Sequence, residues 1–374
     1  MKKITYFIAA IMVLSLVLTA CSAPAATTVP APATTEAPAA ATTEAPAATT
    51  TEAPAAATTE APAAATTAAP ASAEEITPVY EFDASIKANK PYKIAIVLKN
   101  FTNAVWLQHV QYAEQAGRDL GVEISSYAPE KPENIEEQIR ILEDLIAKKV
   151  DCVVLAPTNS ESIAAGIVKL NEAGIPVAYD NTRGSGGDYL TYVGLDNEKL
   201  GNELGEYIAE KMDYKGKLLI LEGVPGQSTS DLRSKGVKDV LAKYPDIEYE
   251  AQPAHWQFSE ALDITNAMLT KWPDLKAIIA VGSNMSEASA EAVEAAGISQ
   301  DDIIIGSFDV TPQVVTAIRE GKIDFTIEQG IFQQAYWSVA ACVQKLNGLE
   351  VPKEMRSPVT FVDINNLDQF APKE

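Results

Sequence analysis

The chain has 374 residues, of which 51 are acidic and 29 are basic, giving a formal net charge of −22. This charge argues against nucleic acid, whose phosphates need a basic face, and against a polybasic patch for membranes. The excess of acidic residues is sufficiently explained by solubility, because a large net charge keeps a protein in solution.

The N-terminal segment begins with Lys2 and Lys3, followed by an apolar run over residues 4–20. A basic head, an apolar middle and small residues before a break predict a secretory signal. The cysteine at position 21 makes it resemble the bacterial lipoprotein signal, which implies that Cys21 is lipidated and becomes the new N-terminus. The alternative is an uncleaved anchor, for which the run is slightly short. Under either interpretation the remaining chain works outside the cytoplasmic membrane.

Residues 22–78 consist almost entirely of Ala, Thr, Pro and Glu, with the repeat Thr-Thr-Glu-Ala-Pro beginning at Thr34, Thr42, Thr50 and Thr58. Frequent proline prevents a helix, and the composition cannot bury enough apolar surface to offset the entropy of ordering. We therefore expect a disordered tether between the signal, residues 1–21, and a folded body. About fifty residues of extended proline-rich chain reach at most ~150 Å.

From residue 93 onward, strand and helix patterns alternate. Helical spacing covers residues 105–120, 134–148 and 163–172. Buried strands are expected at residues 93–98, 123–127, 152–156, 176–179, 217–221, 277–281, 303–306 and 325–327. Repeated βαβ units predict an α/β fold with two similar doubly wound parallel-sheet lobes. Ligands of such sheets bind beyond the carboxyl ends of the strands.

Those strand ends carry carboxylates, carboxamides, arginine and aromatic residues. This set suits a polyhydroxylated ligand, because carboxylates, amides and arginine pair with hydroxyls and aromatic faces cover the C–H surface of a ring. Each candidate has a structural alternative: Asp180 and Asp309 can cap loops or helices, Arg233 can lie on a surface helix, the tryptophans can belong to the core, and Gln329 can pair with backbone.

Signatures of an enzyme are missing. The two histidines, His109 and His255, have no metal-ligand spacing, and no Gly-x-Ser-x-Gly motif occurs. We expect His109 to be a packed or solvated helix residue. Cys152 and Cys342 lie in strand and helix patterns, so we expect small core residues and no disulfide. The sequence therefore predicts a protein that is not an enzyme, with neither a metal nor a cofactor.

Several motifs in order make residues 92–369 resemble the ribose-type family of periplasmic sugar-binding proteins, the receptors of simple-sugar ABC transporters. The motifs are Ala-Pro-Thr-Asn at 156–159, Gly-Ile-Pro-Val-Ala-Tyr-Asp at 174–180, Val-Gly-Leu-Asp-Asn at 193–197, Arg-Ser-Lys-Gly at 233–236 and Ile-Gly-Ser-Phe-Asp at 305–309. The resemblance implies lobes of residues 92–195 plus 330–355 and 196–329 plus 356–374, joined by a three-segment hinge.

The family's ligand contacts can be transferred by position. They fall on Asn103, Trp106, Asp180, Asn181, Arg233, Trp256, Asp309 and Gln329. The chain departs from the family pattern at Val105, where an aromatic residue is usual, at Asn181 in place of arginine, and at Gly282 in place of asparagine. These departures argue against ribose itself.

The resemblance implies a monomeric, lipid-anchored receptor in the cell envelope, on the outer face of the cytoplasmic membrane. It would capture a monosaccharide or polyol by closure of two lobes and deliver it to the permease subunits of an ABC importer. One alternative is a sensor of a sugar or autoinducer for a chemoreceptor or histidine kinase. Another is an exported hydrolase.

Overall fold

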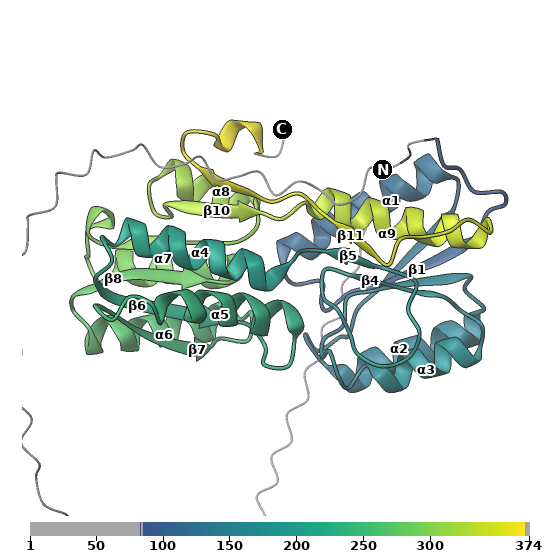
Figure 1. The fold of residues 1–374 in the computed structure, drawn as a ribbon, viewed down its shortest axis with the longest axis horizontal. Coiled ribbons are helices and arrows are strands. Elements are labelled where there is room, and N and C mark those ends of the chain that lie inside the picture. Colours follow the sequence, from purple (N-terminus) through teal and green to yellow (C-terminus); the bar gives the residue numbers. More distant parts are fainter. Residues whose placement is uncertain (1–82, 84, 371–374) are drawn as a thin grey trace, which may run out of the picture. The chain divides into compact units, whose positions relative to one another are not determined.

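The protein is described by a computed structural model that covers Asp83 and residues 85–370 (Figure 1). The predicted signal at residues 1–21, with Cys21, and the predicted tether at residues 22–78 lie outside the described residues. Among the described helices, none is long and apolar enough to cross a membrane.

The first lobe is built on a parallel six-stranded sheet with the strand order β11-β5-β4-β3-β1-β2. Alternate residues of β1 face opposite sides: Ile94 and Ile96 pack with helices α1 and α9, whereas Ala95 and Val97 pack with α2 and α3. The elements are β1 (Lys93–Val97), α1 (Ala104–Leu120), β2 (Glu123–Tyr127), α2 (Ile135–Lys148), β3 (Cys152–Leu155), α3 (Ala164–Glu172), β4 (Val177–Asp180), β5 (Tyr192–Gly194), α9 (Ile331–Leu346) and β11 (Glu354–Arg356).

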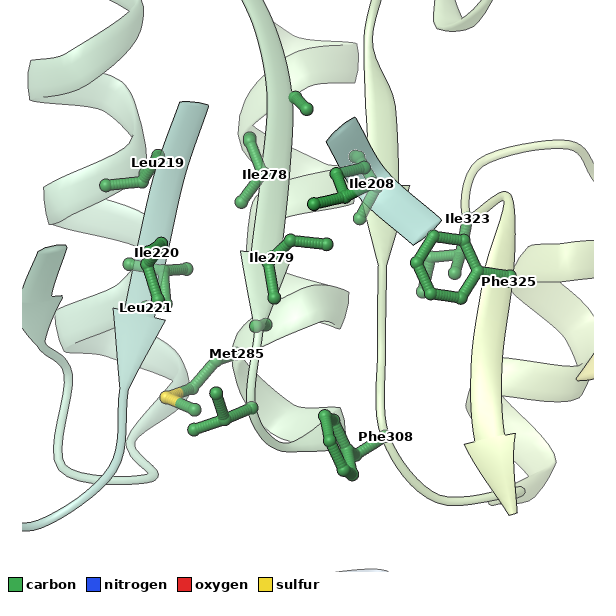
Figure 2. Packing of buried hydrophobic residues seen from close by; sticks show 14 of the residues in the cluster. Ile208, Leu219, Ile220, Leu221, Ile278, Ile279, Met285, Phe308, Ile323 and Phe325 are labelled. Carbon is green, nitrogen blue, oxygen red and sulfur yellow. The ribbon is translucent and has the colours of Figure 1, made fainter. Parts of the chain in front are cut away.

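The second lobe is built on a sheet with the order β12-β10-β9-β8-β6-β7, in which β12 runs antiparallel to β10. Figure 2 shows the core of this lobe, where the strand residues Ile220 and Ile279 pack near Met285 and Phe308. The elements are α4 (Asn197–Lys211), β6 (Gly216–Glu222), α5 (Ser228–Leu241), β7 (Ile247–Pro253), α6 (Phe258–Lys271), β8 (Leu275–Ala280), α7 (Ser283–Ala295), η1 (Gln300–Asp302), β9 (Ile304–Gly306), α8 (Pro312–Arg319), β10 (Phe325–Glu328), β12 (Thr360–Asp363) and η2 (Leu367–Gln369).

The chain crosses between the two sheets three times: from β5 to α4, from β10 to α9, and from β11 to β12. The side chain of Gln334 joins two of these crossings, donating from Nε2 to the carbonyl of Gln329 at 2.6 Å and to Oγ of Ser357 at 3.2 Å. Arg356 donates to the carbonyl of Leu195 at the remaining crossing. The fold is thus the predicted pair of parallel-sheet lobes joined by three segments.

Four strands were not anticipated from the sequence. Strands β5, β11 and β12 are short, with three or four residues each. Strand β7 has seven residues, but it lies at the edge of its sheet and is only partly buried, with Glu248 and Tyr249 exposed. An edge strand of this kind has no continuous apolar run, which is the pattern that identified the central strands.

The expectation that Cys152 and Cys342 are separate core residues is wrong. Both side chains are fully buried, as expected, but they form a disulfide between β3 and α9 across 190 positions of sequence. The sequence offered no signal for this pair, because the contact between β3 and α9 depends on the second crossing, which returns the chain to the first lobe.

Candidate ligand-binding site

A cavity of about 40 Å³ lies between the carboxyl ends of the two sheets. Residues of both lobes line it. The first lobe contributes Lys99, Asn100, Asn103, Val105, Trp106, Glu133, Asn181 and Ile331, and the second contributes Thr229, Arg233, Trp256, Val281, Gly282 and Asp309, with Gln329 at a crossing. Of the predicted site residues, Asp180 alone is absent from this lining.

Asp180 lies behind the cavity wall. It is fully buried at the end of β4, where one carboxylate oxygen is 2.6 Å from Nε2 of His109 and the other accepts a hydrogen bond of 3.1 Å from Ser338. Both partners belong to the helices α1 and α9 that cover one face of the sheet. The ring of His109 is also fully buried, 6.0 Å from the ring of Trp106. Asp180 therefore supports the wall that carries Trp106.

Arg233 is held in the cavity wall by several polar contacts. Its guanidinium donates to Oδ1 of Asn197 at 2.8 Å, to the carbonyl of Val281 at 3.0 Å and to Oε1 of Gln329 at 2.7 Å, and it lies 4.1 Å from the ring centroid of Phe308. Burial lowers the pKa of Arg233 to about 10, a change that Asp309 opposes. The arginine is charged at neutral pH and held in one orientation.

Asp309 completes this cluster. Its carboxylate accepts a hydrogen bond from Nε2 of Gln329, which in turn holds Arg233 and accepts from Asn181 at 3.3 Å. Burial raises the pKa of Asp309, while the bond from Gln329 and the charge of Arg233 lower it. A carboxylate held in this way presents acceptor oxygens to ligand hydroxyls.

The close approach of helices α4 and α5 positions Arg233. A Cβ atom on Gly201 of α4 would lie 2.3 Å from the carbonyl oxygen of Arg233, and one on Gly236 of α5 would lie 2.4 Å from the carbonyl of Glu198. Both contacts are with backbone, which cannot move aside without separating the helices. The two glycines therefore set the depth of Arg233 in the cavity.

Lys99 was missed as a site residue. It lies two residues after the end of β1, is 3% exposed, and donates from Nζ to Oε1 of Gln227 at 2.9 Å. The ammonium lies 5.4 Å from the ring centroid of Trp106 and 5.8 Å from that of Trp256. Burial lowers the pKa of Lys99 to about 8, opposed by the charge of Glu133. Its place at the end of a buried strand was the signal that could have identified it.

Gln227 and Glu133 were also missed, and together they join the lobes. Gln227 precedes α5 in the second lobe and donates from Nε2 to Glu133 at 2.6 Å and to the carbonyl of Thr158 at 2.8 Å, both in the first lobe. Its Oε1 accepts from Lys99 and, at 2.9 Å, from Nε1 of Trp256. Both polar atoms of the Gln227 amide are thus hydrogen-bonded, and each of them has at least one partner in the first lobe.

Two glycines make room for the indole of Trp256. A Cβ atom on Gly223 would lie 1.9 Å from the indole, and one on Gly282 would lie 2.8 Å from it. Trp256 itself has a φ of 60°, in the left-handed region, which turns its side chain toward the cavity. The departure from the family pattern at Gly282 therefore has a structural reason, because a side chain there would collide with the tryptophan ring.

A protein-family model, described as the periplasmic binding protein domain, matches residues 94–350, which is more than half of the chain. The chain belongs to the periplasmic binding protein family. This binding protein is 26% identical to the ribose import binding protein of Salmonella typhimurium over 66% of its own length and 82% of that protein. It is 27% identical to the D-allose-binding periplasmic protein of Escherichia coli, covering 63% of this chain and 78% of that protein.

Two solved structures have the same fold as this binding protein. One is a solute-binding protein of an ABC transporter from Actinobacillus succinogenes with bound D-allose, at 28% identity and a TM-score of 0.70, covering 75% of this chain and all of that one. The other is a solute-binding protein of an ABC transporter from Agrobacterium vitis with bound α-D-tagatopyranose. It also has 28% identity and a TM-score of 0.70, and the match covers 76% of this chain and 100% of that one. These relatives are binding proteins for small sugars.

Proposed function

We propose that this chain captures a monosaccharide or a related polyol by closure of its two lobes and delivers it to an ABC importer. One observation carries the proposal: Arg233 and Asp309 of the second lobe face one cavity with Asn103 and Trp106 of the first. Charged groups that bind hydroxyls, beside aromatic faces that cover a ring, form the set that a sugar requires. The names of the relatives support the same class of ligand.

Binding requires the lobes to separate and close again. A cavity of about 40 Å³ is far smaller than the several hundred Å³ of usual ligand pockets, and residues of both lobes line it. A ligand that contacts both lobes stabilises the closed state by its differential affinity for that state. The closing units are the lobe of residues 92–195 plus 330–355 and the lobe of residues 196–329 plus 356–374.

The ligand contacts of this proposal are Asn103, Trp106, Asn181, Arg233, Trp256, Asp309 and Gln329, all of which line the cavity. Lys99 joins them, because its ammonium faces the same space. Asp180 keeps a supporting role behind Trp106 through His109.

Anchoring by a lipid on Cys21 and a tether over residues 22–78 form the second part of the proposal. They would hold the receptor beside the permease and raise its effective concentration there. Metabolic labelling with palmitate tests this part: the wild-type chain should incorporate label and remain with membranes, and Cys21→Ala should do neither. Unlabelled wild-type protein would contradict it.

A thermal-shift screen with pentoses, hexoses, inositols and deoxy-sugars tests the capture of sugars. A ligand at a hundredfold excess over its Kd stabilises the folded state by about 2.7 kcal/mol, which raises the melting temperature measurably. The same screen on Asp309→Asn provides the control, and it should show no shift. If no carbohydrate shifts the wild-type protein, the proposed function is wrong.

A further inference from the structure

A second hollow of about 430 Å³ adjoins the ligand cavity. Helix α1 contributes Gln108 and Tyr112 to its lining, helix α9 contributes Phe332 and Gln333, and β10 contributes Glu328. The remaining lining includes Pro358, Thr360, Gln369 and Phe370. We call this hollow the outer pocket.

The outer pocket and the ligand cavity share a wall. Val105, Asp309 and Ile331 line both spaces, and each of these residues is at most 5% exposed. The wall is therefore one side chain thick. Two of its three members, Val105 and Ile331, are aliphatic. Val105 occupies a position where the ribose-type family usually has an aromatic residue. The wall is therefore thinner at this position than an aromatic ring would make it.

The chemistry of the outer pocket repeats that of the inner cavity. Tyr112 and Phe332 pack edge to face at 5.3 Å between ring centroids, and Phe332 is 38% exposed. The carboxylate of Glu328 accepts a hydrogen bond of 2.7 Å from the backbone N–H of Gly330. Burial raises the pKa of Glu328 to about 7. Aromatic faces, amides and a carboxylate together again suit a hydroxylated ring.

From the shared wall and this repeated chemistry, we propose that the ligand has two rings: a monosaccharide unit in the inner cavity, linked past Val105 to a second ring in the outer pocket. The ligand class is a disaccharide or another glycoside. A hollow of about 430 Å³ falls within the usual range for small-molecule pockets, roughly 300–1,000 Å³. This inference rests on the proposed capture of a sugar and narrows its ligand class.

Calorimetry on the full chain tests the inference with free monosaccharides, their phenyl glycosides and a panel of disaccharides. We expect at least one glycoside to bind about tenfold more tightly than its parent monosaccharide, a difference of about 1.4 kcal/mol. Phe332→Ala should remove most of this gain and leave the Kd of the monosaccharide unchanged. Phe258→Ala is the matched control, because Phe258 is also 38% exposed but lies in the second lobe outside both spaces, and it should change neither Kd.

Gln108→Trp gives an independent test by filling the outer pocket, because Gln108 lines that hollow and not the ligand cavity. It should keep binding of the monosaccharide and lose the gain from the second ring, and if it does not fold, the pair Phe332→Ala and Phe258→Ala still decides. Binding of monosaccharides without any gain for glycosides would overturn this inference and leave the proposed function intact. Binding of no carbohydrate at all would overturn both.

Discussion

The Nζ atom of Lys99 lies 2.9 Å from Oε1 of Gln227, and this contact joins a buried cation of the first lobe to the start of a helix in the second. The same amide also binds Trp256, Glu133 and the carbonyl of Thr158. Gln227 is therefore central to the contact between the lobes, although the resemblance to sugar-binding proteins assigned it no role.

Replacing Gln227 with methionine should weaken ligand binding. The change keeps the length of the side chain but removes its hydrogen bonds across the cleft, two of them to charged groups, each worth about 1.5–3 kcal/mol. We expect the Kd measured by calorimetry to rise at least about tenfold. Gln257→Met is the matched control, because Gln257 also precedes a helix of the second lobe but contacts only its own loop through its side chain. Equal Kd values for the two variants would contradict a role of Gln227 in holding the lobes together around a ligand.

Lys99 should make stability depend on pH above neutrality. Its pKa is about 8 in the folded chain and 10.5 when unperturbed, so the folded chain loses this proton first as the pH rises. Below pH 8 burial of the charge costs stability, by about 3 kcal/mol at 1.36 kcal/mol per pH unit, and this cost disappears as the pH approaches 10.5. The melting temperature of wild type minus that of Lys99→Met should therefore rise between pH 8 and pH 10. Parallel melting curves over this range would show that Lys99 is not buried as a cation.

Asp309 and Asp180 should respond differently to the same substitution. Asp309 lines the cavity, so Asp309→Asn should raise the Kd for a sugar about a hundredfold or more by weakening hydrogen bonds to ligand hydroxyls. Asp180→Asn should lower the free energy of unfolding by about 1–3 kcal/mol through its partner His109 and raise the Kd less than tenfold. Calorimetry and urea unfolding of both variants measure these effects. The reverse order of Kd values would place the ligand on the other side of the wall.

Gly201→Ala should harm both stability and binding. The added methyl group would lie 2.3 Å from the backbone oxygen of Arg233, so α4 and α5 must separate, at about 1–3 kcal/mol. Gly166→Ala in α3 is the matched control, because its methyl group would meet only the flexible end of Leu142, at 2.7 Å. We expect urea unfolding to show the larger loss for Gly201→Ala, and calorimetry to show weaker ligand binding for this variant alone.

Reduction of the disulfide should lower stability substantially. A link that closes a loop across 190 positions is worth about 5 kcal/mol in the chain-entropy account. Urea unfolding with and without dithiothreitol measures the difference. The double variant Cys152→Ala, Cys342→Ala should resemble the reduced wild type and should not respond to the reductant. A wild-type midpoint that ignores reductant would show that the bond is absent in solution.

The features of this chain that its sequence predicts are the local ones. Central strands have continuous apolar runs, and side chains just past their ends face the cleft, so residues such as Arg233 and Asp309 could be anticipated from the motifs around them. Gln227 and Glu133 could not, because the hydrogen bond between them joins opposite lobes. Asp180 shows a finer limit. Asp180 is the last residue of β4 and points to the helices, whereas Asn181 follows the strand with a φ of 57°, in the left-handed region, and lines the cavity.

The disulfide between β3 and α9 can form only late in the synthesis of the chain. The whole of β6–β10 lies between its two cysteines, so strands β1–β5 of the first sheet are synthesised early and helix α9 late. Until then, the face of the sheet that carries Ile94 and Ile96 lacks one of its covering helices and is exposed to aggregation. A chain truncated before residue 331 would keep Cys152 as a free thiol. The bond between Cys152 and Cys342 can thus form only after synthesis has passed β6–β10 and reached α9.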